Sequence, residues 1–188
     1  LFSVTGREFS NAQVEILNFM WVVTSYPDPS IWPNLVAALG GTARSTPSMS
    51  LVAGISVSEA AIYGRRPERK VLDFFYRLSS AIDQGSSLEA FIEQEIKIRK
   101  IVCGYGRPLA KLDERIPYTL EKVEALGLQH GRHFRLALDV YRYLKKTRGL
   151  SMNIAAVNTG LIADMGFTPE QYQLFLTPCF ISGMIPCY

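Results

Sequence analysis

The sequence predicts an all-α protein, and three observations support that class. Apolar residues recur at the three- and four-residue spacing of an amphipathic helix through most of the chain. No segment shows the period-two alternation of a half-buried strand, and no hairpin dipeptide stands between two such segments. Proline, glycine and N-capping residues stand at the ends of the periodic segments, as they do at helix termini.

Three helices are expected in the first third of the chain, at residues 11–24, 29–39 and 48–62. The first has apolar residues around much of its circumference, so it should be well buried, and Pro27 and Pro29 should end it. Asp28 is the expected N-cap of the second helix, and Gly40-Gly41 its expected end. The third helix is rich in serine, alanine and glycine. Because small residues let helices approach closely, it should pack tightly inside the fold or form a subunit interface.

Two amphipathic helices are expected in the middle of the chain, at residues 67–84 and 87–99. Ser87 should cap the second of them. The segment 101–115, IVCGYGRPLAKLDER, then interrupts the helical pattern with two glycines and ends in an Asp-Glu-Arg cluster. The rest of the chain is organised around this segment.

Further helices are expected towards the C-terminus, at residues 117–126, 131–148 and 155–165. Thr168 should cap the next helix, with Pro169 as its first residue. The apolar segment 176–187 should be kinked by Pro178 and Pro186.

The composition excludes several classes of function. The 188 residues suffice for one domain, or for a large domain with a smaller partner, and 48% apolar with 20% charged residues is ordinary for a soluble globular protein. A net charge of +3, spread along the chain, does not predict a nucleic-acid surface. No apolar run reaches the roughly 18 residues of a membrane span, and the N-terminus does not resemble a signal peptide.

The three cysteines are too few and too scattered for a disulfide framework or a CxxC metal site, so a reducing, cytoplasmic location is expected. His130 and His133 stand three residues apart, but no Cys, Asp or Glu nearby completes a ligand set, so no metal site is expected.

Three segments, in order, resemble the active-site segments of the citrate synthase family. Residues 55–68, ISVSEAAIYGRRPE, resemble the small-residue helix that leads into the family's Gly-Pro-Leu-His-Gly-Gly turn. Residues 101–115 resemble its Gly-aromatic-Gly-His turn, which matches at 104–106, and its Asp-Pro-Arg, which falls on 113–115 after a shorter spacer. Residues 149–162, GLSMNIAAVNTGLI, resemble its Asn-Val-Asp-Phe-Tyr-Ser-Gly stretch.

The resemblance implies a mainly helical homodimer, with a large and a small helical domain in each subunit and the active site in the cleft between them. Residues 1–63 and 154–188 would belong to the large domain, and residues 64–153 to the small one. Family members are longer at the N-terminus and carry further helices at the C-terminus. The chain is therefore expected to be a fragment, a single domain or a reduced relative, and dimerisation is expected through residues 48–62.

The resemblance also assigns the site residues, and the catalytic ones are replaced. Tyr63 and Arg107 stand at the positions of the two family histidines. Ala156, or Ala155 if the register slips by one, stands at the catalytic aspartate, so the base is missing. Phe180 replaces an arginine that holds a substrate carboxylate.

Other elements of a binding site are kept. Gly104, Tyr105 and Gly106 preserve the turn that lies against the CoA adenine in the family, and Arg115 stands at a substrate-binding position. Arg65, Arg66 and Lys111 are further candidates for phosphate or carboxylate contacts. The alternative is that Arg65 and Arg66 are a solvated helix entry and that Arg115 pairs with Asp113 or Glu114.

Two functions remain open. Family members remove a proton next to a thioester and join the carbon to a 2-keto acid, which requires a base and preorganised donors. Tyr63 and Arg107 can donate hydrogen bonds but are poor neutral-pH bases, so ordinary citrate synthesis is not expected. The first function is a rebuilt acyl-CoA transferase or lyase that uses a CoA thioester and an organic acid, with no permanently bound cofactor. The second is a non-catalytic relative that acts as a regulatory or dimerisation partner, with Tyr63 serving for packing.

Overall fold

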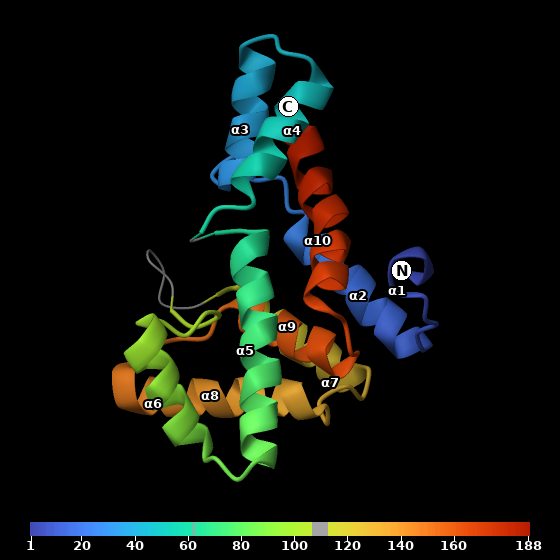
Figure 1. The fold of residues 1–188 in the computed structure, drawn as a ribbon. Helices are drawn as coiled ribbons and strands as arrows, with labels where there is room; N and C mark the ends of the chain where they lie inside the picture. Colours follow the sequence, from blue (N-terminus) through green and yellow to red (C-terminus); the bar gives the residue numbers. More distant parts are fainter. Residues whose placement is uncertain (62, 107–112) are drawn as a thin grey trace. The chain divides into compact units, whose positions relative to one another are not determined.

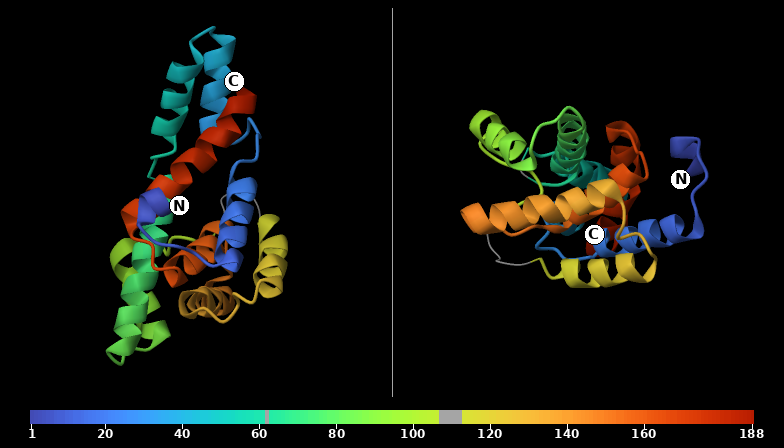
Figure 2. Two further views of the ribbon diagram at one scale, coloured as in Figure 1. Left: turned by 90° about the vertical axis from the view of Figure 1, so that its right-hand side faces the viewer. Right: turned by 90° about the horizontal axis from the view of Figure 1, so that it is seen from below.

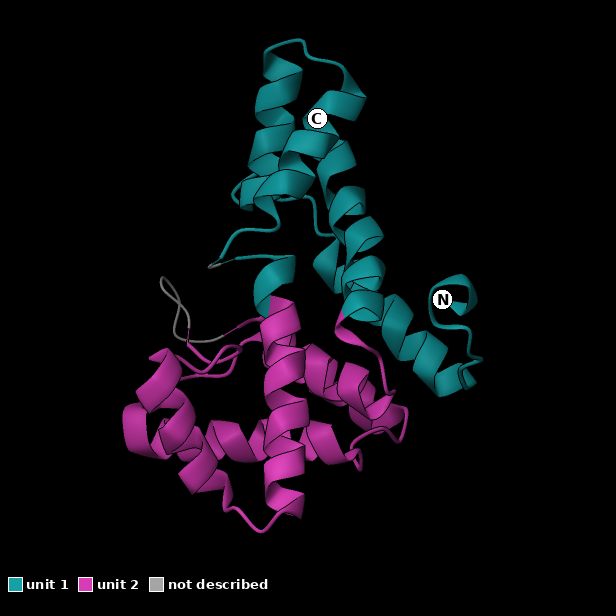
Figure 3. Cartoon of the chain, viewed as in Figure 1, with its two compact units in different colours: residues 1–67, 170–188 teal, residues 68–169 magenta. Residues whose placement is uncertain are grey.

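The computed structural model describes residues 1–61, 63–106 and 113–188, and these form two compact units. Unit 1 comprises residues 1–67 and 170–188, and unit 2 comprises residues 68–169 (Figure 3). The regular secondary structure of the described residues is helical, with a single isolated β-bridge and no strand, which confirms the all-α prediction (Figure 1). The division into a large domain of residues 1–63 and 154–188 and a small domain of residues 64–153 stays a prediction.

Unit 1 contains α1 (Phe2–Thr5), α2 (Asn11–Thr24), α3 (Trp32–Thr42), α4 (Pro47–Val57), almost all of α10 (Pro169–Met184) and the short 3₁₀ helix η1 (Ile185–Cys187). Helices α3 and α4 lie side by side, and η1 also contacts α3 (Figures 1 and 2). Apolar side chains of α2 and α10 are buried, and Trp21 meets Phe175 edge to face with ring centroids 6.4 Å apart.

The bounds of α3 differ from the prediction at both ends. The Asp28 carboxylate does not cap this helix but accepts a hydrogen bond from the Ser30 amide at 2.8 Å, and α3 begins only at Trp32, with Pro33 in its first turn. The helix also runs through Gly40 and Gly41 instead of stopping there. Gly40 faces Ser50 of α4 so closely that an added Cβ would lie 2.5 Å from the Ser50 Cβ. These glycines therefore permit close packing and do not end the helix.

Helix α4 is shorter than predicted, because it ends at Val57 and not at residue 62. Thr46 caps its start by accepting a hydrogen bond from the Met49 amide. The Ser58 carbonyl then accepts a hydrogen bond from the Arg65 amide at 2.7 Å, which closes the segment that joins α4 to α5.

Unit 2 contains α5 (Arg65–Asp83, from residue 68), α6 (Leu88–Arg99), α7 (Arg115–Ala125), α8 (Arg132–Arg148) and α9 (Ile154–Asp164). Helix α9 packs against α8 and α7, and α8 also contacts α6. The predicted apolar face of α5 is buried at Val71, Phe74, Phe75 and Leu78, and Ser87 caps α6 as expected. All five helices lie within one or two residues of their predicted ends.

Helix α10 runs without interruption through Pro178 to Met184. The apolar segment from residue 176 is thus the second half of α10, followed by η1, and the kink at Pro178 stays a prediction, whereas Pro169 does stand at the first helical position. No helix in the described ranges is both long enough and apolar enough to span a membrane.

Candidate functional site

The turn at residues 104–106 is held against the segment that leads into α9. Gly104 and Gly106 have φ of +89° and +96°, a region that L side chains rarely adopt. The Gly106 amide donates to the Ser151 carbonyl at 2.6 Å, and the Asn153 amide donates to the Gly104 carbonyl at 3.0 Å. Two of the predicted site segments, 104–106 and the start of α9, are thus brought together inside unit 2.

Tyr105 lies between these two glycines and points into the core. Its side chain is buried, and its hydroxyl donates a hydrogen bond to the Ala137 carbonyl of α8 at 2.9 Å. Burial, with a smaller contribution from Asp139, raises the pKa of Tyr105 well above its ordinary value. Tyr105 therefore anchors the turn to α8, and of the two flanking glycines Gly106 is partly exposed whereas Gly104 is buried.

Ala156 lies directly beneath this turn and is fully buried. A Cβ added to Gly104 would lie 3.1 Å from the Ala156 Cβ, which is tighter than most real contacts. Ala155, the alternative position for the family aspartate, is only partly buried. The packing beneath Gly104 therefore leaves little room for a carboxylate at residue 156.

Asp113 is a buried carboxylate close to the start of α9. Its Oδ2 accepts a hydrogen bond from the Ile154 amide at 2.9 Å and another from Arg115 Nη2 at 2.9 Å. Its Oδ1 accepts from Arg115 Nε at 2.9 Å and from the Arg115 amide at 3.3 Å. With four N–H donors on its two oxygens and no exposed side-chain surface, Asp113 caps α9 and orients Arg115.

Arg115 pairs with Asp113, which is the alternative that the sequence had left open. About a third of its side chain remains exposed. Burial lowers the pKa of Arg115, but the hydrogen bonds that it donates to Asp113 and the charges of Asp113, Glu68 and Glu114 outweigh this effect, so the pKa of Arg115 is raised. Arg115 thus stays charged, and a substrate carboxylate would have to share it with Asp113.

In unit 1, Arg65 secures the segment that carries Tyr63. Its guanidinium is buried and bonds Ser58 Oγ at 2.9 Å, Glu59 Oε1 at 2.6 Å and the Thr177 hydroxyl of α10. Burial, partly offset by Glu59, lowers the pKa of Arg65 from its ordinary value. Arg65 is thus neither a solvated helix entry nor a group facing a ligand.

Tyr63 itself is half-buried and packs against Trp32, with ring centroids 5.5 Å apart. Arg66 is exposed, and Phe180 lies half-buried on α10. Arg107 and Lys111, the remaining predicted basic residues, lie outside the described residues.

A further polar side chain lies on α9, near the site. Asn158 lies one turn after Ala155, and its buried Oδ1 has no hydrogen-bond partner among the residues that the structure describes. An orphaned buried acceptor is rare in native proteins. Residues 1–61, 63–106 and 113–188 contain no cluster of His, Cys, Asp and Glu arranged to hold a metal ion.

Comparison with known proteins identifies the fold. No family model matches the sequence, and no curated protein matches it. Among solved structures, citryl-CoA lyase from Hydrogenobacter thermophilus matches with a TM-score of 0.78 and 18% identity over 99% of this chain and 72% of the lyase. Citrate synthase from Thermotoga maritima matches with a TM-score of 0.76 and 15% identity over 98% of this chain and 50% of the synthase.

A third match is citrate synthase from the archaeon Thermoplasma acidophilum, with a TM-score of 0.74 and 13% identity over 96% of this chain and 48% of that protein. The chain thus has a citrate synthase-like fold over nearly its whole length, and it spans about half the length of the two citrate synthases.

Proposed function

We propose that this chain binds a coenzyme A thioester together with an organic acid, on a citrate synthase-like scaffold whose reacting groups have been replaced. The observation that carries the proposal is the glycine turn at 104–106, which is held against residues 151–153 beside the start of α9. In the family that the sequence resembles, the CoA adenine lies against the corresponding turn. Similar structures add support, because one is named citryl-CoA lyase and another is a ternary complex with carboxymethyl coenzyme A and oxaloacetate.

The proposal assigns donors to the site but no base of the family's kind. Tyr63 would donate to a developing oxyanion, and Arg107 and Arg115 would bind the carboxylates of the acid. Ala156 has no basic group, and the Asp113 oxygens accept four N–H donors, so neither residue would take a proton from a thioester. If the chain is an enzyme, it is therefore a modified acyl-CoA transferase or lyase, and citrate and free CoA should not appear from acetyl-CoA and oxaloacetate. A cytoplasmic location is part of this proposal.

A second candidate is a non-catalytic relative that acts as a regulatory or dimerisation partner. Two observations favour it: the buried alanine at the base position, and a set of exposed apolar side chains on α3 and α4. The exposed set comprises Trp32, Leu35, Leu39, Met49 and Val52. In this case the surface of α3 and α4 would bind the partner protein or the second copy of the chain.

The deciding experiment is calorimetric titration of the purified chain with CoA and with acetyl-CoA, alone and with a panel of keto acids and tricarboxylic acids. We expect micromolar binding of CoA that tightens with one acid of the panel. The Gly106→Ala variant should weaken CoA binding by about tenfold, which corresponds to about 1.4 kcal/mol, because its φ of +96° disfavours a side chain.

Gly85→Ala is the matched control, because Gly85 has φ of +90° and a Cβ there would meet nothing within 4 Å. Both variants should lose similar stability, whereas only Gly106→Ala should affect binding. If the native chain binds neither CoA nor acetyl-CoA, the proposal is wrong and the non-catalytic candidate replaces it.

A further inference from the structure

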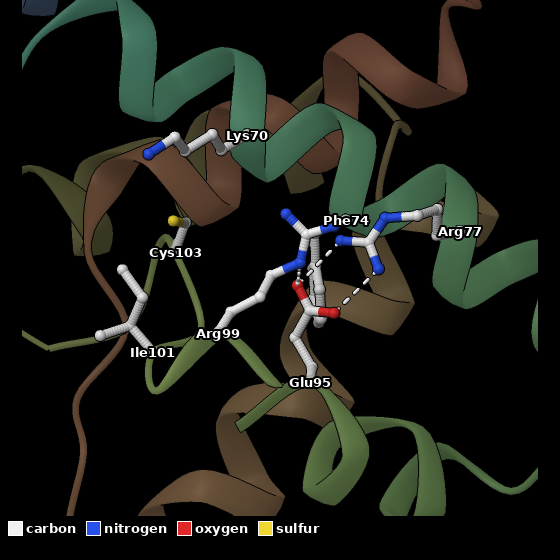
Figure 4. Close-up of a pocket in the computed structure, with 7 residues that line it drawn as sticks. All are labelled: Lys70, Phe74, Arg77, Glu95, Arg99, Ile101 and Cys103. Carbon is white, nitrogen blue, oxygen red and sulfur yellow. Dashed lines mark hydrogen bonds and ion pairs between the residues drawn. The ribbon is translucent and has the colours of Figure 1, made fainter. Parts of the chain in front are cut away.

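Unit 2 contains a basic pocket that none of the assignments above uses. It has a volume of about 230 Å³ and lies between α5, α6 and the segment before Gly104 (Figure 4). Lys70, Phe74 and Arg77 of α5 line it. These residues share one face of the helix because they are spaced by four and three residues. The other lining residues are Glu95, Arg99, Ile101 and Cys103.

A buried carboxylate fixes the two arginines of this pocket. Glu95 is 7% exposed, and its oxygens accept from Arg77 Nη1 and Nη2, both at 2.8 Å. Arg99 Nε lies 3.0 Å from Glu95 Oε1. A guanidinium carries five N–H donors, so Arg99 keeps donors beyond the one that Glu95 uses. Figure 4 shows both guanidiniums gathered at Glu95, with Arg99 reaching into the pocket.

Lys70 adds a charge that Glu95 does not neutralise. It is exposed, and no residue in the described part of the chain forms a hydrogen bond or ion pair with it. Three of the lining side chains are basic and one is a carboxylate, and Asp73, which does not line the pocket, also pairs with Arg77 through Nε at 2.7 Å. Ile101 and the largely buried Phe74 supply the apolar part of the lining. Such a combination suits an anion with an apolar body.

Cys103 lies within the field of these charges. Burial is the main influence and raises the pKa of the Cys103 thiol, while Lys70, Arg99 and Arg77 act in the opposite direction. Its sulfur lies on the same side of the pocket as the Lys70 amino group in Figure 4. Cys103 is therefore placed to report on whatever enters the pocket.

We propose that this pocket binds a small organic anion, a carboxylate or a phosphate ester, with its charged group between Lys70 and Arg99 and its apolar part against Phe74 and Ile101. The proposal goes beyond the binding of CoA at the glycine turn and does not depend on it. A ligand here would contact Ile101 and Cys103, which lead directly into that turn.

The test compares two alkylating reagents of nearly equal size, the anionic iodoacetate and the neutral iodoacetamide. Both reagents react with the thiolate, so the raised pKa of Cys103 slows both reactions alike. The ratio of the iodoacetate rate to the iodoacetamide rate therefore reports how strongly the pocket attracts a carboxylate. We expect this ratio at Cys103 to exceed the ratio at Cys187 by about threefold to tenfold at low ionic strength. Salt near ~1 M should reduce the difference, because the Debye length falls to about 3 Å.

Lys70→Met should lower the ratio at Cys103 severalfold, whereas the control Lys97→Met should leave it unchanged. Lys97 is exposed on α6 and does not line the pocket, so the control removes the same charge from the chain. Millimolar inorganic phosphate should also slow the reaction of Cys103 with iodoacetamide, without affecting Cys187.

Three results would overturn the proposal: equal ratios at Cys103 and Cys187, a ratio unaffected by Lys70→Met, or no protection of Cys103 by phosphate. The salt dependence and the phosphate protection use the native chain, so they decide the question even if the Lys70 variant folds poorly. Because neither reagent contains CoA, failure here is distinct from failure of the calorimetric titration.

Discussion

Two side chains near the start of α9, Ala156 and Asp113, have structural roles that leave neither of them as a proton acceptor. Ala156 fills the space beneath Gly104, and Asp113 uses its two oxygens to bind Arg115 and the Ile154 amide. The one buried carboxylate that the structure places there is thus a structural group. At the scale of the residue, Ala156 is part of the core of unit 2.

This arrangement predicts opposite responses at two neighbouring alanines. Ala156→Asp should lower the free energy of unfolding by about 3 kcal/mol or more, because it buries an unpaired carboxylate. Ala155→Asp should change it by less than about 1 kcal/mol, because residue 155 is partly exposed in the first helical turn, where an acid is favoured. Urea unfolding of the two variants beside the native chain measures both effects, and equal midpoints for the two variants would contradict the packing described for Ala156.

At the scale of the element, the pair α3 and α4 shows what a glycine inside a helix can do. Glycine normally weakens a helix interior by about 1 kcal/mol relative to alanine. Here Gly40 allows Ser50 of α4 to approach, and Gly41 lies against the C-terminal residue Tyr188. The two glycines therefore lower the helical propensity of α3 but allow close contact between α3 and its neighbours.

We predict that Gly40→Ala destabilises the chain by about 1–3 kcal/mol, although the same change in an exposed helix would stabilise it. The reason is the collision of the new methyl group with Ser50. Ser50→Gly in the same chain should recover part of the loss, since the Ser50 Cα is 3.3 Å from the added Cβ. Thermal or urea unfolding of both single variants and the double variant gives the coupling energy, and additive effects would exclude the collision.

Most helices could be predicted from the sequence, because apolar periodicity and capping residues act locally. Ser87 and Pro169 mark helix starts where they were expected. The errors arose where a neighbouring element decides the outcome: Gly40 and Gly41 continue α3 because α4 and Tyr188 lie against them, and α4 ends early where Arg65 closes the following segment.

Less of the candidate site than of the helices could be predicted from the sequence. The resemblance singled out residues 104–106 and the start of α9 as separate site segments, and the structure brings these two segments together. The burial of Ala156 and Arg65 could not be predicted, because it depends on packing between segments far apart in sequence. The basic pocket could not be predicted from the sequence, because its side chains come from three segments, and only Lys70, Phe74 and Arg77 have a spacing that indicates a shared helix face.

At the scale of the whole molecule, the exposed apolar side chains of α3 and α4 predict a homodimer. Leu35 and Leu39 share one face of α3, and Met49 and Val52 share one face of α4. Large exposed apolar patches on a folded protein commonly mark interaction surfaces.

The chain should sediment as a dimer at micromolar concentration, and the double variant Leu39→Asp, Met49→Asp should sediment as a monomer. Val22→Asp is the control, because Val22 is more exposed than either residue but lies on α2. Analytical ultracentrifugation distinguishes these states, and a native chain that is strictly monomeric would rule out the predicted interface.

The cap that Asp113 provides for α9 also bears on the order in which the chain assembles. Asp113 reaches the Ile154 amide across 41 residues, whereas Asn153 caps the same helix from the adjacent position, through the Ala155 amide. Helices form locally in about a microsecond, while contacts distant in sequence must first close a long loop. Helix α9 can therefore begin from its own asparagine, whereas the contact with Asp113 forms only when the chain between them has brought the two segments together.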